Sequence, residues 1–309
     1  MAAILTKALS LVVIVAIGYG IKKIGWVKAE HFSVLAIIVL RITLPAALIT
    51  SFNTVTISGS LAWLIALGFA ANFIQQIVSW LRYRRRSTEE RAFDMLHAGS
   101  YNIGAFAMPY TSHFIGPAAM VPTALFDAGN AMAAAGLGYG WGMSIAKKKP
   151  MKVLGFVATM FHSPVFIVYF SLLILRLFHI SFPDPIISFT SLVGAANPFC
   201  AMLMIGIGLE LAVPKQKWIK ALRYLAKRYS YTIAFSLIIW FLLPQSVFGM
   251  DIKLVLMVVV WAPFAAMTSG FVDEAKGDVE LATLLASITI IIAILMMPTV
   301  YMILNTLTV

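Results

Sequence analysis

The sequence is poor in charged residues and contains a single cysteine. Charged side chains make up 11% of the 309 residues, well below the level of about 25% that is typical of soluble domains. Cys200 has no second cysteine with which to pair, so the sequence excludes an internal disulfide and a cysteine-based zinc site. The low charge argues against an ordinary soluble globular protein of this length.

Apolar residues take the place of the missing charge. Hydrophobic residues make up 61% of the chain, and the mean hydropathy is +0.94. A membrane-spanning helix needs roughly 20 mostly apolar residues, and about ten such segments fit the chain. We place them at residues 3–21, 33–53, 60–81, 92–113, 119–145, 156–178, 186–211, 229–247, 252–272 and 281–305. The first segment lacks a small-x-small cleavage pattern, so we expect a retained span and not a signal peptide.

The basic residues are distributed unevenly between the predicted loops. Of the 23 Lys and Arg residues, 19 follow the first, third, fifth, seventh and ninth segments, including RYRRR at 82–86 and the run from Lys215 to Arg228. This asymmetry follows the positive-inside rule. It predicts a multi-pass protein of the cell membrane, in contact with lipid, with both termini on the extracytoplasmic side. Topology thus accounts for the net charge of +11, and we expect no nucleic-acid partner.

The two halves of the chain share a proline pattern at a nearly constant offset. RITLPAALIT, with Pro45, corresponds to GAANPFCAMLMIG, with Pro198, at an offset of 153 residues. AMPYTS, with Pro109, corresponds to WAPFAAMTSG, with Pro263, at an offset of 154 residues. Because each half holds an odd number of segments, the second half has to cross the membrane inverted. The sequence predicts an all-α protein of about ten transmembrane helices in two inverted five-helix repeats, the plan of many secondary transporters.

Pro109 and Pro263 predict breaks in the fourth and ninth helices. Backbone groups freed by a break in lipid are costly, so breaks persist only where protein or a watery cavity satisfies them. Transporters place such breaks at the substrate and ion sites. We assign substrate contacts to Asn102, Pro109, Tyr110 and Pro263, with Pro109 ending one half-helix. We assign coupling-ion contacts to Thr111, Ser112, Thr268 and Ser269.

Two ionisable residues lie inside predicted segments. Arg41 is four residues before Pro45, at a depth where a charge costs about 2.5–3.5 kcal/mol on insertion scales. Its guanidinium suits bidentate contact with a substrate carboxylate; a structural ion pair with an intramembrane acid, or snorkelling, is the alternative. Thr123, Asp127 and Asn130 share one helix face. We expect Asp127, together with Asn130 and Thr123, to bind a coupling ion or a proton; the alternatives are pairing of Asp127 with Arg41 or another cation, and a plain structural role.

Several stretches, in order and in spacing, resemble the auxin efflux carrier family of secondary transporters. ILTKALSLVVIVAIGYGIKKIGWVKAEHFSVLAIIVLRITLPAALITSF is similar to the opening of that family, and NIGAFAMP resembles its Asn-x-Gly-Phe-x-Gly-x-Pro crossover. HSPVFIVYFSLLILRLFHISFPDP, NPFCAMLMIGIGLEL and APFAAMTSGFVDEAKGDVELATLLASITIIIAILMMPTV resemble the sixth, the seventh and the last two spans. The similarity extends from about residue 4 to residue 305.

The resemblance implies a fold in which the fourth and ninth helices cross as broken helices, as in bile-acid/sodium symporters. It implies a scaffold of residues 1–56 and 152–213, through which two copies form a homodimer, and a moving transport domain of residues 57–151 and 214–309. It also implies a small carboxylate substrate, such as malate, malonate or an auxin-like acid. Glu274 and Asp278 would then bind the coupling ion, with solvated loop acids as the alternative.

These observations favour a secondary active transporter of a small organic anion, working by elevator-type alternating access. We expect coupling to a proton or sodium gradient, with no other cofactor. The sequence holds no nucleotide-binding motif, which argues against ATP-driven transport, and no nucleophile–base set or metal cluster in a segment, so we expect no enzyme. A sodium-coupled bile-acid-like symporter, a receptor and a channel stay open as alternatives.

Overall fold

The computed structural model describes residues 2–53, 59–150, 164–210 and 215–308. Helices account for 85% of the structure, and the described residues contain no β-strand. The helical elements are α1 (Ala2–Lys23), α2 (His31–Ile38), η1 (Val39–Thr43), α3 (Leu44–Asn53), α4 (Gly59–Tyr83), α5 (Thr88–His97), η2 (Ile103–Ala107), α6 (Met108–Phe114), η3 (Pro117–Ala119), α7 (Met120–Ala131), η4 (Met132–Gly138), α8 (Tyr139–Lys147), α10 (Pro164–Leu177), α11 (Asp184–Ala195), α12 (Asn197–Gly208), α13 (Lys215–Leu242), α14 (Gln245–Val259), α15 (Met267–Glu274) and α16 (Val279–Thr308). This confirms the predicted all-α class.

Five helices are long and apolar enough to cross a membrane. Within the described residues they are Ile4–Lys23, His31–Asn53, Leu61–Tyr83, Asp184–Gly208 and Val279–Thr308. Each coincides with a predicted segment. Their outer faces are apolar, as along α1, where Leu5, Leu9, Val13 and Ile17 are all exposed. A soluble monomer rarely exposes contiguous apolar surface, so this pattern is the one expected of helices that face lipid.

Two of the predicted segments are interrupted instead of forming one helix. The segment at 92–113 stops at His97 and resumes at Ile103, and the segment at 252–272 stops at Val259 and resumes at Met267. The first interruption contains Gly99 in the left-handed region, at φ 69°. A Cβ atom there would approach the Asn72 Cα to 2.6 Å, so both the backbone conformation and the close neighbour favour glycine.

Short π-helical turns precede two of the prolines. η1 ends two residues before Pro45, and η2 ends two residues before Pro109. Proline has no N–H to bond to the carbonyl four residues earlier, and a π-turn widens the helix where that bond is missing. As a result residues 31–53 and 103–114 stay helical through their prolines.

Glycine pairs bring two sets of helices into close contact. In the contact of α4 with α7, a Cβ at Gly68 would lie 2.0 Å from the Phe126 carbonyl oxygen, and one at Gly129 would lie 1.9 Å from that of Ile65. In the contact of α1 with α12, Gly18 and Gly206 face each other in the same way. Small residues let membrane helices pack backbone to backbone.

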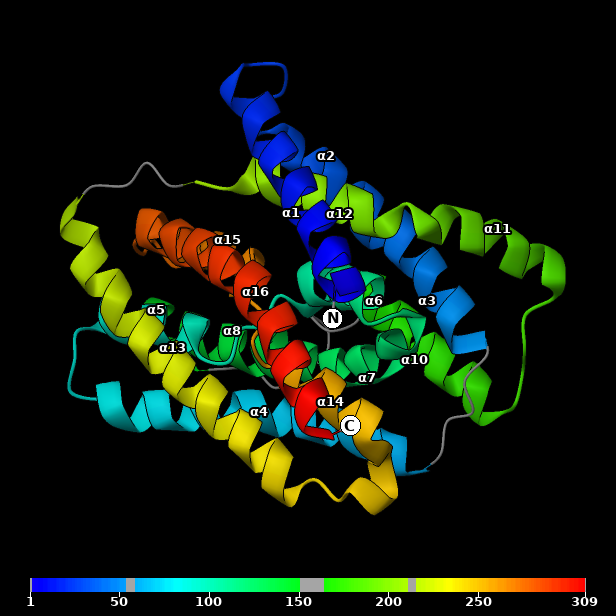
Figure 1. Cartoon of the computed structure of the whole chain (residues 1–309). Helices are drawn as coiled ribbons and strands as arrows, with labels where there is room; N and C mark the ends of the chain where they lie inside the picture. The colour runs from blue at the N-terminus through cyan, green and yellow to red at the C-terminus, as the bar shows by residue number, and fades with distance from the viewer. Residues whose placement is uncertain (1, 54–58, 151–163, 211–214, 309) are drawn as a thin grey trace.

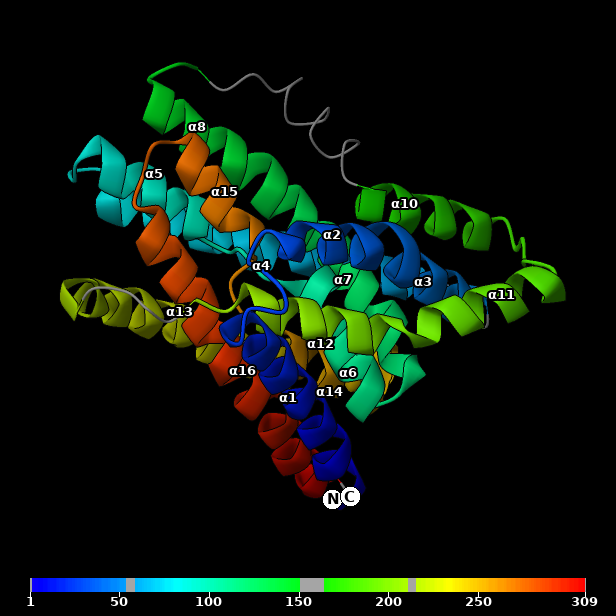
Figure 2. The same cartoon turned by 90° about the horizontal axis from the view of Figure 1, so that it is seen from above.

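The helices are arranged around a central crossing. α5, α8 and α15 lie at one end of the molecule, and α3 and α11 lie at the opposite end (Figures 1 and 2). α7 runs between them, and α1 and α16 converge so that the two chain ends lie on the same side (Figure 2). The two interrupted segments meet in the interior of this arrangement.

Candidate functional site: the crossing of two interrupted helices

The two interruptions are joined to each other. Tyr101 and Phe264 form an isolated antiparallel bridge, and the Asn102 N–H donates to the Pro263 carbonyl oxygen at 2.8 Å. Both bridge residues are buried, with 2% and 4% of their surfaces exposed. The chain therefore crosses itself at the point where both helices lack their internal hydrogen bonds.

Side chains satisfy the backbone groups that the interruptions release. Asn130 donates from Nδ2 to the Tyr101 carbonyl oxygen at 3.1 Å and accepts from the Tyr101 N–H at 3.4 Å. The Thr289 hydroxyl accepts from the Phe264 N–H at 3.0 Å, and the Ser100 hydroxyl accepts from the Ala265 N–H at 3.2 Å. Such partners are what interrupted helices need in the absence of water.

Asp127 lies beside this crossing, as part of α7. Its Oδ1 accepts from Asn130 Nδ2 at 2.7 Å, and its Oδ2 accepts from the Tyr169 hydroxyl of α10 at 2.7 Å. The backbone of Gly104, at the start of η2, lies next to the carboxylate. A Cβ at Gly104 would lie 3.1 Å from Asp127 Oδ2, so the glycine keeps the backbone close to the acid.

Asp127 is buried without a positive partner. It is 6% exposed, and within the described parts of the chain no Lys or Arg pairs with it. Arg41, the partner considered as an alternative, is exposed on the outer side of η1. A buried carboxyl group in this setting is stable as the neutral acid or as a carboxylate with a bound cation. The site can therefore hold a proton or a small cation.

The hydroxyl groups assigned to the coupling ion are bonded mostly within their own helices. Thr111 donates to the Ala107 carbonyl at 2.7 Å, and Thr123 donates to that of Ala119 at 2.7 Å. Ser112 and Ser269 bond to the carbonyls of Pro109 and Ala266. Thr268 instead contacts the Ser100 hydroxyl at 2.7 Å. Of this group, only Thr268 thus takes part in the crossing.

The residues assigned to substrate are divided in the same way. Asn102 and Pro263 are in the crossing, and among the described residues the Asn102 side chain has no hydrogen-bond partner. The prediction that Pro109 ends a half-helix is wrong: Pro109 lies in α6, after the break, because η2 carries the helix past it. Tyr110 is buried and donates to the Ile294 carbonyl at 2.6 Å, which ties α6 to α16.

Glu274 and Asp278 are not part of the Asp127 site. Glu274 pairs with Lys147 of α8 at 2.8 Å and accepts from the Tyr139 hydroxyl at 2.7 Å. Asp278 pairs with Lys217 of α13 at 2.6 Å. Both acids are partly exposed, with side-chain exposures of 47% and 31%. The structure uses them to join neighbouring helices at the surface.

A second charged cluster escaped the sequence interpretation. The sequence predicts Lys227 and Arg228 to be loop residues, but α13 begins at Lys215 and carries both inward. Lys227 bonds to both carboxylate oxygens of Asp94, at 2.6 and 2.7 Å, and so joins α13 to α5. Arg228 donates to the Ala262 carbonyl at 2.8 Å. Two basic residues at the end of a basic run give no local signal that they turn inward.

Tyr169 and Thr289 were missed for a different reason. Each lies inside an apolar segment and contacts a residue far away in the chain, Asp127 and Phe264 respectively. No spacing rule within a helix reveals such a partner. The segments around Pro45 and Pro198 are also joined by a contact that the sequence does not reveal. The Thr43 hydroxyl, two residues before Pro45, donates to Oδ1 of Asn197, the residue before Pro198, at 3.0 Å.

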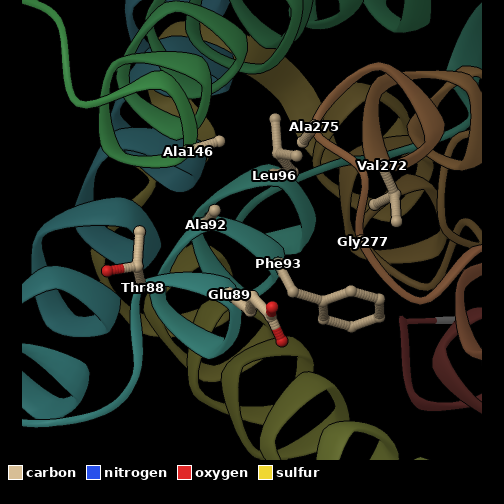
Figure 3. A pocket seen from close by; sticks show the side chains of 9 residues that line it. All are labelled: Thr88, Glu89, Ala92, Phe93, Leu96, Ala146, Val272, Ala275 and Gly277. Atoms are coloured by element: carbon tan, nitrogen blue, oxygen red, sulfur yellow. The ribbon is translucent and has the colours of Figure 1, made fainter.

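A separate pocket lies between α5, α8 and α15 (Figure 3). Its lining is mainly apolar and includes Phe93, Leu96, Ala146 and Val272, with Thr88 and Glu89 as polar members. Its volume is about 40 Å³. It holds none of the residues predicted for substrate or ion.

Comparison with known proteins adds no assignment to these observations. No model of a known protein family matches the chain, and no curated protein matches it either. The functional conclusion therefore depends on the residues and contacts described above.

Proposed function

We propose that the chain is a secondary transporter of a small carboxylate, with Asp127 as the group that binds the coupling cation or proton. One observation carries the proposal. Two interrupted helices meet beside a buried acid that has no cationic partner. Interrupted helices at a charged centre are the arrangement that transporters use for substrate and ion, and a buried acid is a functional group by default in a membrane.

The position of Asp127 supplies a coupling mechanism. Gly104 and Asp127 belong to the proposed transport domain, whereas Tyr169 of α10 belongs to the proposed scaffold. The hydrogen bond of 2.7 Å between Tyr169 and Asp127 joins the two. A proton or cation bound to Asp127 changes how strongly its carboxyl group accepts the hydrogen bond from the Tyr169 hydroxyl. It therefore changes the strength of the contact across which the two domains move.

The remaining architecture belongs to the same proposal. We propose the ten-span inverted repeat and the placement of both termini outside the cell on the strength of the sequence patterns, and the membership of the auxin efflux carrier family and the homodimer on the strength of the resemblance. The convergence of both chain ends on one side (Figure 2) supports an even number of spans. Asn102 supplies a buried side-chain amide for the substrate carboxylate, and Arg41 faces outward, available to a partner copy or to lipid headgroups.

Gradient-driven uptake tests the proposal. The purified protein is placed in liposomes, and uptake of radiolabelled mono- and dicarboxylates is measured under a sodium gradient and under a pH gradient. We expect saturable uptake under one of the gradients. An absence of uptake under both, across the panel of carboxylates, would contradict the proposal.

Asp127→Asn tests the role of the acid. The amide keeps the size of the side chain but carries neither proton nor charge, so we expect gradient-driven accumulation to be lost while carboxylate binding persists. Asp184→Asn, at an exposed position in the first turn of α11, is the matched control. Concentrative uptake by Asp127→Asn at the level of this control would remove Asp127 from the coupling site.

A further inference from the structure

A buried cation touches both residues of the crossing. Arg228 of α13 is 3% exposed. Its guanidinium carbon lies 3.8 Å from the centre of the Tyr101 ring and 4.8 Å from that of the Phe264 ring. Its Nη2 donates to the Ala262 carbonyl at 2.8 Å. Arg228 therefore binds the crossing through two ring faces and one carbonyl, all of which suit a cation.

None of these contacts neutralises the charge. In the described residues no carboxylate pairs with Arg228, and its Nη1 has no hydrogen-bond partner. Asp94, an acid of the same cluster, is 1% exposed in its side chain and bound to Lys227 through both oxygens. Two cations, Arg228 buried and Lys227 mostly buried, thus lie beside one buried anion. An uncompensated buried charge is strongly unfavourable.

A small pocket adjoins this excess charge. Arg228 and Lys227 line it with the side chains of Gln75, His97, Tyr224 and Tyr231. The volume is about 10 Å³, which is the room that one water-sized occupant needs. Within the described chain, the two tyrosine hydroxyls have no hydrogen-bond partner. Three donors without a partner, one on a guanidinium and two on phenols, therefore belong to residues that line a space of about the size of one water molecule.

We propose that this pocket binds one monovalent anion of halide size. The anion would accept from Arg228 Nη1 and from the tyrosine hydroxyls, and it would balance the buried charge. The Asp94 carboxylate, which also lines the pocket, is already neutralised by Lys227 and does not exclude it. The site contacts the crossing through Tyr101 and Phe264, so its occupancy stabilises the bridge. It does not depend on the proposed transport activity, because binding requires no gradient and no carboxylate substrate.

Thermal unfolding under exchanged anions tests this site. The purified full-length protein in detergent is unfolded in sodium gluconate, sodium chloride, sodium bromide and sodium formate, all at one ionic strength. Gluconate is too large for the pocket and serves as the reference. We expect chloride and bromide to raise the unfolding midpoint by a few degrees, because a ligand that binds only the folded state stabilises it. An identical midpoint in chloride and gluconate would overturn the proposal in favour of a trapped water.

Variants locate the effect. We expect Arg228→Gln to lose the chloride response, whereas Arg223→Gln, which removes the same charge from an exposed position of α13, should keep it. If Arg228→Gln fails to fold, Gln75→Glu tests the site instead. This change places a carboxylate at the pocket that would take the place of the anion, so the response to chloride should be lost. A wild-type response in Gln75→Glu, or in a folded Arg228→Gln, would contradict the site. A shift with formate but not with chloride would overturn the halide assignment in favour of a carboxylate.

Discussion

Single side chains, and not runs of backbone hydrogen bonds, hold the crossing together. The Asn130 side chain forms hydrogen bonds with both the N–H and the carbonyl of Tyr101. The hydroxyls of Thr289 and Ser100 accept from backbone N–H groups of the second interruption. Each of these contacts links residues that are far apart in sequence. Removing one partner therefore leaves a buried group unpaired, which costs more than the hydrogen bond itself contributes.

Tyr169→Phe isolates one of the bonds to Asp127. The change removes the hydroxyl that donates to Asp127 Oδ2 and leaves the donor of Asn130 in place. We expect a loss of about 1–3 kcal/mol in the free energy of unfolding, measured by denaturation in detergent. Tyr301→Phe is the control, because among the described residues the Tyr301 hydroxyl has no hydrogen-bond partner. Equal effects of the two changes would show that the bond to Asp127 adds no stability.

Glu274 gives a pH dependence outside the spans. Hydrogen bonds from Lys147 and Tyr139 lower the pKa of the Glu274 carboxyl from its ordinary value. Because the folded-state pKa lies below the unfolded one, the stabilisation is present above the unfolded pKa and disappears as pH falls through the folded value. The pair is half exposed, so its contribution is below about 1 kcal/mol. The difference in unfolding midpoint between wild type and Glu274→Gln should shrink from neutral pH toward about pH 3; a constant difference would contradict this.

At the scale of helices, close packing depends on a few glycines. Gly18 of α1 faces α12, and a Cβ there would lie 2.4 Å from the Leu203 carbonyl oxygen. Gly20 is on the same helix, and no atom of the described residues lies within 4 Å of its Cβ position. The two glycines therefore differ in what surrounds them and not in helix propensity.

Gly18→Ala and Gly20→Ala form a matched pair. We expect Gly18→Ala to destabilise the protein by about 1–3 kcal/mol, because α1 and α12 have to separate. Gly20→Ala should be neutral or slightly stabilising, since alanine favours a helix by up to about 1 kcal/mol over glycine. Unfolding of both variants in one detergent measures the difference. If both changes have the same effect, the contact of α1 with α12 is not limited by Gly18.

The helices were easier to predict than the crossing. Long apolar segments such as 3–21 and 281–305 announce a helix through composition alone, and the structure has helices there. Pro263 marked one interruption correctly, but Pro109 misplaced the other, because a π-turn lets the helix continue through proline while Gly99 lies at the break. Arg228 and Tyr169 act through partners in distant segments, and a single sequence does not encode those pairings locally.

For the whole molecule, the charge asymmetry predicts one orientation in the membrane. The sequence places the loop at 82–86 inside the cell and both termini outside, and the structure places the two chain ends together (Figure 2). Arg85 and Thr306 are both exposed, so each can carry a reporter without disturbing the core.

Single-cysteine labelling tests this orientation. In a Cys200→Ala background, we expect Thr306→Cys to react with a membrane-impermeant maleimide on intact cells. Arg85→Cys should react only after permeabilisation, because the positive-inside rule keeps that loop in the cytoplasm. The reverse pattern would invert the predicted topology, and reaction of both residues on intact cells would contradict a membrane-spanning arrangement between them.

The hydrogen bond from the Asn102 N–H to the Pro263 carbonyl makes hydrogen exchange at the Asn102 amide a measure of how often the crossing opens. Pro263 has no N–H with which to return the bond, so this part of the crossing opens without breaking a regular series of neighbours. Exchange of the Asn102 amide with deuterium then records how often the two interrupted segments part. The rate would be readable by mass spectrometry in the unlabelled, unmutated protein, and any ligand that holds the segments together would slow it.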